Sequence, residues 1–288
     1  NVKKANNVAA IFVPGFSIAE GTNIDFLFNP STETMTLKAE SEFLEYWKFL
    51  VTELAVNADN TTAPDTLNIY FQSKDLYFPG YSAPSSSVHA KASADRLGVT
   101  ARISDQETDI NATFDINAWF GRRLDGSLEV NGKFAPSYIS TANQTWRIFD
   151  EGVTYDPEGI YINNFRIVNG TQELYAGGAI SNSRSDTLRI ELKELDAALF
   201  SPLLAKTGYS ISGELNGYAD ISSVMKQPLL SADISLERLK INSYSIEAID
   251  MRSQWDFGRE RARVVLTGRN TGKEYVNGYY RPSDNAYM

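Results

Sequence analysis

The chain has 288 residues, of which 42% are hydrophobic and 12% are aromatic, enough for one long all-β unit or two ordinary domains. Its net charge of −9 at pH 7 argues against nucleic acid as a partner, because nucleic-acid binding requires basic surfaces. It contains no cysteine, which excludes disulfides, thiolate metal sites and cysteine nucleophiles.

The first elements of the chain are strand-like. Residues 24–28 and 35–39 are predicted to be strands on either side of the turn at Asn29-Pro30-Ser31. Strands resume at residues 67–71 and 76–78, and a connection of small residues follows at 81–87. Four further strands are predicted over residues 88–94, 97–103, 108–116 and 128–134.

One helix is predicted between the first strands, over residues 41–56. Ser41 can cap its first turn, and large apolar side chains follow at helical spacing. These side chains are Phe43, Trp47, Leu50, Val51 and Leu54. Acids outnumber bases on its polar face, so we expect the helix to pack over a sheet rather than lie on anionic lipid.

The second half has a sharper alternating pattern. Residues 160–168 and 173–180 are joined by Asn169-Gly170, a strong hairpin signal. Asn163-Asn164 shifts the apolar parity within the first of these strands, as a β-bulge would. After the alternating run at 187–192 comes a helical-looking insert at 195–206. The remaining predicted strands are residues 211–221, 229–241, 246–257, 262–267 and 275–280.

Residues with catalytic potential are sparse. His89 is the only histidine, it follows a run of serines in a strand-like segment, and no Gly-x-Ser-x-Gly motif accompanies it. The densest carboxylate group, Asp105 with Glu107 and Asp109, lies at a predicted turn, where solvated acids are expected. We therefore expect a protein that is not an enzyme and that has no catalytic residues, no metal site and no cofactor.

An ordered set of features from Trp146 onward carries a family resemblance. It comprises Trp146-Arg147-Ile148, Gly159 to Phe165, Gln172 to Ser181, Ser185 to Leu188, Leu199 with Leu203, Gly213-Glu214-Leu215-Asn216-Gly217, Pro228, Ser253-Gln254-Trp255-Asp256 and Gly278 to Pro282. In this order, over about 140 residues, the second half resembles the TamB family, the translocation and assembly modules of Gram-negative envelopes, in the style of the Bacteroides group.

The resemblance implies an elongated, curved antiparallel sheet folded into an open trough, often called a β-taco, with an apolar concave face. It also implies a periplasmic protein, anchored in the inner membrane at full length and reaching the outer membrane. Such a protein would carry phospholipid acyl chains between the membranes, support outer-membrane protein assembly, or both. We expect residues 1–288 to be a middle or C-terminal fragment of one continuous trough, with possible sub-units at 1–140 and 141–288, plus one or two short helices.

Alternation assigns candidate side chains to the two faces of such a trough. The residues expected on the concave, lipid-facing side are Leu188, Ile190, Leu192, Leu215, Ala219, Ile221, Leu230, Ile234 and Leu236. Those expected to face water are Arg189, Glu191, Glu214, Asn216, Asp220, Asp233 and Glu237. Alternation alone fits a closed sandwich equally well, and only the resemblance favours the open trough.

Two other kinds of function remain open. A carbohydrate-binding or adhesive β-protein would expose aromatic side chains such as Tyr138, Trp146 and Tyr161 on a flat face. A purely structural spacer would bind neither lipid nor glycan. Within the trough interpretation, a sheet edge could also pair with an unfolded outer-membrane strand, which would connect the protein to the outer-membrane assembly machinery.

Overall fold

The computed structural model describes residues 15–78, 81–105, 109–141, 144–200, 208–226, 228–281 and 286–287. These residues form strands almost throughout, and hydrogen bonding assigns the strands to one antiparallel sheet. The all-β class and the antiparallel pairing predicted from the sequence are therefore confirmed. By contacts within the chain, residues 1–121 and 132–147 form a first compact unit, and residues 122–131 and 148–288 form a second.

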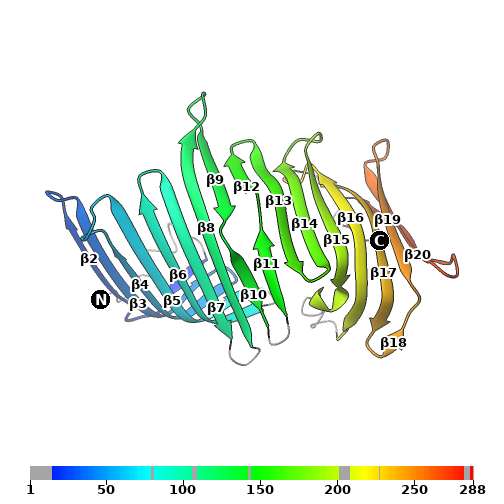
Figure 1. Cartoon of the computed structure of the whole chain (residues 1–288), viewed down its shortest axis with the longest axis horizontal. Coiled ribbons are helices and arrows are strands. Elements are labelled where there is room, and N and C mark those ends of the chain that lie inside the picture. The colour runs from blue at the N-terminus through cyan, green and yellow to red at the C-terminus, as the bar shows by residue number, and fades with distance from the viewer. Residues whose placement is uncertain are drawn as a thin grey trace. The chain divides into compact units, whose positions relative to one another are not determined.

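In the first unit, most strands that follow one another in the sequence pair side by side (Figure 1). The strands are β1 (Phe16–Ile18), β2 (Asn23–Asn29), β3 (Thr34–Tyr46), β4 (Phe49–Asp59), β5 (Thr66–Phe78), β6 (Tyr81–Ser93), β7 (Arg96–Asp105), β8 (Ile110–Arg122), β9 (Leu128–Phe134), β10 (Ser137–Ser140) and β11 (Thr145–Phe149). The last residue of β8, part of β9 and the end of β11 belong to the second unit.

In the second unit, too, most strands pair with the next strand along the chain. Its strands are β12 (Gly152–Asp156), β13 (Gly159–Asn169), β14 (Gln172–Ser181), β15 (Thr187–Asp196), β16 (Ile211–Ser222), β17 (Leu229–Ile241), β18 (Tyr244–Ser245), β19 (Ile249–Asp256), β20 (Arg261–Gly268), β21 (Glu274–Arg281) and β22 (Ala286–Tyr287). A single 3₁₀ turn, η1 (Ala197–Phe200), follows β15.

The predicted helix over residues 41–56 is wrong. Those residues form the end of β3, a turn at Trp47-Lys48, and most of β4. Glu53 has φ +45, and the buried side chains Val51 and Leu54 lie three residues apart on either side of this irregularity. The turn, together with the three-residue spacing of Val51 and Leu54, places apolar residues at the intervals typical of a helix, although the segment is not helical.

Two other local predictions also require correction. The small-residue connection at 81–87 is part of strand β6, where Ser86 fills a position that is only 6% exposed. The predicted insert at 195–206 begins inside β15 and is helical only over η1, among the residues described there. Its remainder, 201–206, lies outside the described residues.

The hairpin and the bulge predicted in the second half are confirmed. Asn169 pairs with Gln172 across the turn, and Gly170 takes a positive φ of 60°. The register of β13 with β14 shifts between Ile162 and Phe165, and Asn164 has φ +50. Bulges of this kind bend a strand and raise its local twist.

Buried side chains are few. In the second unit, Leu229, Trp255 and Ala262 form a small cluster with Tyr280 packed against it. In the first unit, the buried apolar positions include Val51, Leu54 and Ala58. Among the described residues, no large side chain is less than 2% exposed.

Candidate functional site

In the first unit, apolar residues occupy two complete cross-strand rows from β2 to β8. We call them the N-terminal apolar rows. One contains Ile24, Ala39, Val56, Phe71, Val88, Ala101 and Phe114, and the other contains Phe26, Leu37, Ala58, Ile69, Ala90, Val99 and Ile116. Directly opposed residues of antiparallel strands point to the same side, so each row is one line of neighbouring apolar side chains.

These rows are only partly shielded from solvent. Of their members, Ala58 alone is buried, at 6% exposure. Ile24 and Phe26 on β2 are 43% and 57% exposed, and the others are half-buried. With strands about 4.8 Å apart, the six intervals of a seven-strand row amount to about 29 Å.

The opposite side of the same strands is polar. The row between the two apolar rows contains Asp25, Lys38, Asn57, Tyr70, His89, Thr100 and Asp115. Thr100 Oγ1 donates to Asp115 Oδ1 at 2.5 Å, and the Tyr70 ring stacks on His89 at 4.2 Å between centroids. The lone histidine of the sequence is thus a stacked member of a polar row.

The nine residues predicted to face lipid lie on β15, β16 and β17, and the structure brings them together. The register sets Leu188, Ile221 and Leu230 in one row, and Leu195, Leu215 and Leu236 in another. The two rows between them are Ile190, Ala219 and Ala232, and Leu192, Gly217 and Ile234. We call these four lines the C-terminal aliphatic rows.

Eight of the twelve positions in these rows also remain partly accessible, while Leu188, Leu195, Leu215 and Ala232 are buried. Among the nine predicted residues, Leu188 and Leu215 are the most enclosed, each 9% exposed, and the other seven are half-buried. Whether lipid contacts them stays a prediction.

Two local irregularities keep these rows in line. Glu194 has φ +48, and the register shifts between Leu192 and Leu195, so both leucines stay in the rows. Gly217 has φ +129, and an added Cβ would overlap the carbonyl oxygen of Asp233 on β17. Only glycine fits this backbone without a close contact, so the Leu192 row has no side chain at the position of Gly217.

Sequence reasoning missed much of the apolar surface. The Leu192 row continues through Ile167 and Leu174 on one flank and through Met251, Leu266 and Val276 on the other. The N-terminal apolar rows were missed altogether, because the end of β3 and most of β4 were interpreted as a helix. The alternation of Leu37 with Ala39, and of Val56 with Ala58, was the available signal.

Charged residues occupy the other side of the C-terminal strands. Arg189 lies 3.0 Å from Asp220 and 3.6 Å from Glu191. Arg269 lies 2.6 Å from both Glu237 and Asp250. Of the seven residues predicted to face water, Arg189, Glu191 and Asp233 are exposed, while Glu214, Asn216, Asp220 and Glu237 are half-buried.

One of these ion pairs shifts the titration of a carboxyl group. Hydrogen bonds from the Arg269 guanidinium, at 2.6 and 3.1 Å to Oδ1, lower the pKa of Asp250, with a smaller opposing effect of desolvation. Asp250 and Glu237 in turn raise the pKa of Arg269. Arg269 therefore joins residues from β17 and β19 across the charged side.

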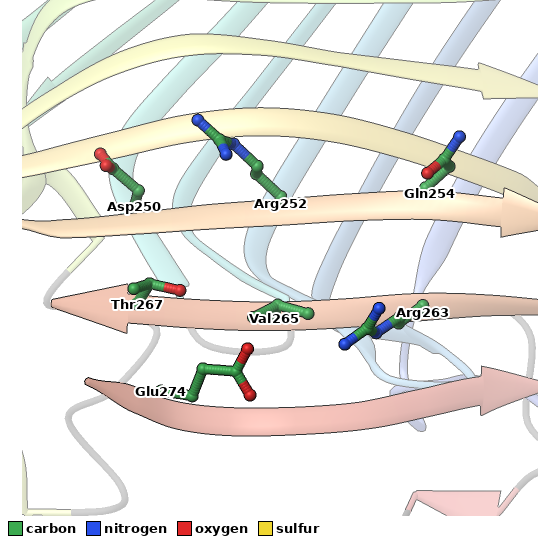
Figure 2. Close-up of a pocket in the computed structure, with 7 residues that line it drawn as sticks. All are labelled: Asp250, Arg252, Gln254, Arg263, Val265, Thr267 and Glu274. Carbon is green, nitrogen blue, oxygen red and sulfur yellow. The ribbon is translucent and has the colours of Figure 1, made fainter. Parts of the chain in front are cut away.

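A shallow hollow on this charged side is shown in Figure 2. Its lining comes from β19 (Asp250, Arg252, Gln254), β20 (Arg263, Val265, Thr267) and β21 (Glu274). Arg252 is 3.5 Å from Asp233, and Arg263 Nε donates to Asn277 Oδ1 at 3.3 Å. Asp250 and Glu274 share this lining with the two arginines, so the hollow is part of the charged side of the sheet.

The aromatic and carboxylate candidates of the sequence lie apart from these rows. Tyr138 is 42% exposed and Tyr161 is half-buried, but Trp146 is only 7% exposed, so it does not offer the open ring expected for glycan stacking. Glu107 of the Asp105 carboxylate group lies outside the described residues. Within the described ranges, no group of three or more His, Cys, Asp or Glu side chains could hold a metal ion.

The described part of the chain contains no helix long and apolar enough to cross a membrane. Comparison of the chain with known protein families, with curated proteins and with solved structures finds no match.

Proposed function

We propose that the apolar rows line an open trough that holds phospholipid acyl chains and guides them between the inner and outer membranes of a Gram-negative envelope. The observation that carries the proposal is the partial exposure of many apolar side chains in cross-strand rows, on one side of a sheet whose other side is polar. No acid, base or cofactor is needed for such transport.

The exposures support an open trough over a closed sandwich. In a sandwich, a second sheet packs about 10 Å away and buries the inward rows. Here one of the fourteen residues in the N-terminal apolar rows is buried, and seven of the nine predicted lipid-facing residues are half-buried. The bulges at Asn164, Glu194 and Arg238 bend their strands, as a curved wall requires.

The energetic argument rests on shielding hydrocarbon from water. Exposing one methylene costs about 0.8 kcal/mol, so a 16-carbon chain in water costs on the order of 12 kcal/mol. A row of about 29 Å is close to the ~30 Å hydrocarbon core of a bilayer, which two acyl chains fill end to end. One such row is therefore long enough to shield a whole acyl chain.

The sequence resemblance to the TamB family supports the location and partners. It suggests a periplasmic trough, an inner-membrane anchor at full length, and a contact with the outer-membrane assembly machinery. Support for outer-membrane protein assembly is the second role consistent with that resemblance. The aliphatic rows favour lipid, because acyl chains require apolar side chains and no specific hydrogen bonds.

The direct test is to extract the purified chain with organic solvent and identify lipid by mass spectrometry, and then to measure uptake of a fluorescent phospholipid. We expect co-purified phospholipid and saturable uptake. Absence of both would refute the proposal. A glycan array separates the carbohydrate-binding alternative, and a structural spacer would be silent in all three assays.

A pair of charge substitutions tests the proposed wall in the second unit. Ile234→Asp places a carboxylate in the Leu192 row, whereas Gln254→Asp places the same charge on the other side, in the hollow that Arg252 and Arg263 also line. Ile234→Asp should reduce lipid uptake while the circular dichroism spectrum stays strand-like. Equal losses in the two variants would contradict the assignment of faces.

A further inference from the structure

Strand β2 (Asn23–Asn29) is an edge strand in the part of the chain that the structure describes. Among the described residues it pairs only with β3, and all seven of its residues are exposed. Phe26, Leu27 and Phe28 are 57%, 73% and 56% exposed. Such an edge presents unpaired peptide groups together with uncovered apolar side chains.

The register identifies which peptide groups face outward. The carbonyl oxygen of Met35 accepts a hydrogen bond from Asn60 N at 3.2 Å, so the peptide groups of Met35 point toward β4. Peptide groups alternate along a strand, so those of Leu37 and Ala39 point the same way. Their partners on β2, which are Phe28, Phe26 and Ile24, therefore turn N–H and C=O toward the open edge.

This edge lacks the usual devices that prevent strand addition. Residues 23–29 contain no proline, no lysine and no bulge, and their only charge is Asp25. An open edge of this composition is a site for pairing with another strand.

The sequence of the edge is complementary to itself. In an antiparallel pair of two such strands centred on Phe26, Ile24 faces Phe28 and Asn23 faces Asn29, so outward peptide groups meet outward peptide groups. Asp25 then lies opposite Leu27 and not opposite its own copy. Of the two adjacent registers of the same parity, one sets Asp25 against Asp25, which like-charge repulsion disfavours. The other sets Ile24 against Pro30, which has no N–H to donate.

We propose that β2 pairs with β2 of a second copy of this chain, antiparallel and with Phe26 opposite Phe26. In this pair Ile24, Phe26 and Phe28 of both copies lie on one side, and the apolar row that contains Phe26 continues into the same row of the second copy. The contact between two seven-residue strands is small in comparison with a standard protein–protein interface, which buries about 1,600 Å². The dimer is therefore weak and concentration-dependent.

The first test uses the absence of native cysteine. In the proposed register the two Phe26 Cα atoms are about 5.5 Å apart, within disulfide range, whereas the two Leu27 Cα atoms are diagonal at about 7–8 Å, beyond it. Phe26→Cys should therefore cross-link at least about tenfold faster than Leu27→Cys under mild oxidation without lipid. Leu27 is the more exposed residue, so random collision predicts the opposite order.

The second test separates edge pairing from association through apolar side chains. Phe26→Pro removes the outward N–H without touching the hydrogen bonds to β3, and Phe26→Ala removes the ring but keeps the N–H. Sedimentation equilibrium over a range of concentrations should show weak dimers for the unmodified chain and for Phe26→Ala, and monomers for Phe26→Pro.

Three results would overturn the proposal: a monomeric unmodified chain at all concentrations, equal cross-linking of the two cysteine variants, or dimers of Phe26→Pro with a strand-like circular dichroism spectrum. None of these readouts depends on lipid, so failure here leaves the proposed transport function standing.

Discussion

Placing a carboxylate in an N-terminal apolar row should weaken lipid binding far more than the same charge one residue away. Val56 lies between Ala39 and Phe71 in one of these rows, while Asn57 is exposed on the other side, between Lys38 and Tyr70. Val56→Asp and Asn57→Asp therefore add equal charge to adjacent positions of one strand, on opposite sides of it.

The size of the effect follows from the length of hydrocarbon that the new charge leaves in water. If the hydrated carboxylate leaves about three methylenes of a bound chain uncovered, the loss is about 2.4 kcal/mol. The cost of an aspartate at the centre of hydrocarbon, about 2.5–3.5 kcal/mol, gives a similar figure. Either value corresponds to a fall in affinity of roughly 50- to 300-fold.

The assay is titration of the purified variants with a fluorescent phospholipid, with thermal melts to verify that each variant is folded. For Asn57→Asp we expect an affinity within about twofold of the unmodified chain, since the new charge lies beside Lys38 in solvent. A folded Val56→Asp variant with unchanged affinity would refute the claim that this row contacts lipid. So would equal weakening by the two substitutions.

Three further predictions concern stability. Gly217→Ala should lower the melting temperature clearly, because strain at a positive φ costs about 1–3 kcal/mol, whereas Gly98→Ala, which meets only a side-chain oxygen at 3.7 Å, should have little effect. Because Arg269 lowers the folded-state pKa of Asp250, their pair contributes stability above the ordinary aspartate pKa and loses it as pH falls through the lowered one. The difference in denaturant midpoint between the unmodified chain and Arg269→Ala should therefore be constant near neutral pH and shrink in acid, and a difference that is independent of pH would contradict this. Asn60→Ala should cost about 1–3 kcal/mol in urea unfolding, since the buried Asn60 side chain bonds three backbone groups at 2.6 to 2.9 Å, and an unchanged midpoint would show that these bonds contribute nothing net.

The strands of the second half could be predicted because local chemistry and tertiary structure agree there. Asn169-Gly170 suits the tight turn, and the side chains of β15 and β17 alternate over long runs. The cross-strand register could not be predicted, since it depends on which hairpins pair. Even so, alternation alone selected nine residues that the register places side by side.

The helix predicted over residues 41–56 was wrong for a physical reason. The positive φ at Glu53 changes the side of the sheet on which the next side chains emerge, so Val51 and Leu54 are both buried despite odd spacing. Together with the turn at Trp47-Lys48, this produces the three- and four-residue spacing of a helix. Period two is a reliable signal only where a strand has no such irregularity.

Because nearly every long strand pairs with its immediate neighbours in the sequence, the contact order of each unit is low. Low contact order favours rapid folding, and it makes stability close to a sum of hairpin and nearest-neighbour terms. Amide exchange should then protect the middle strands of each unit most and fray progressively toward the terminal ones. Such an arrangement also allows a gene to gain or lose whole hairpins without redesigning a central core.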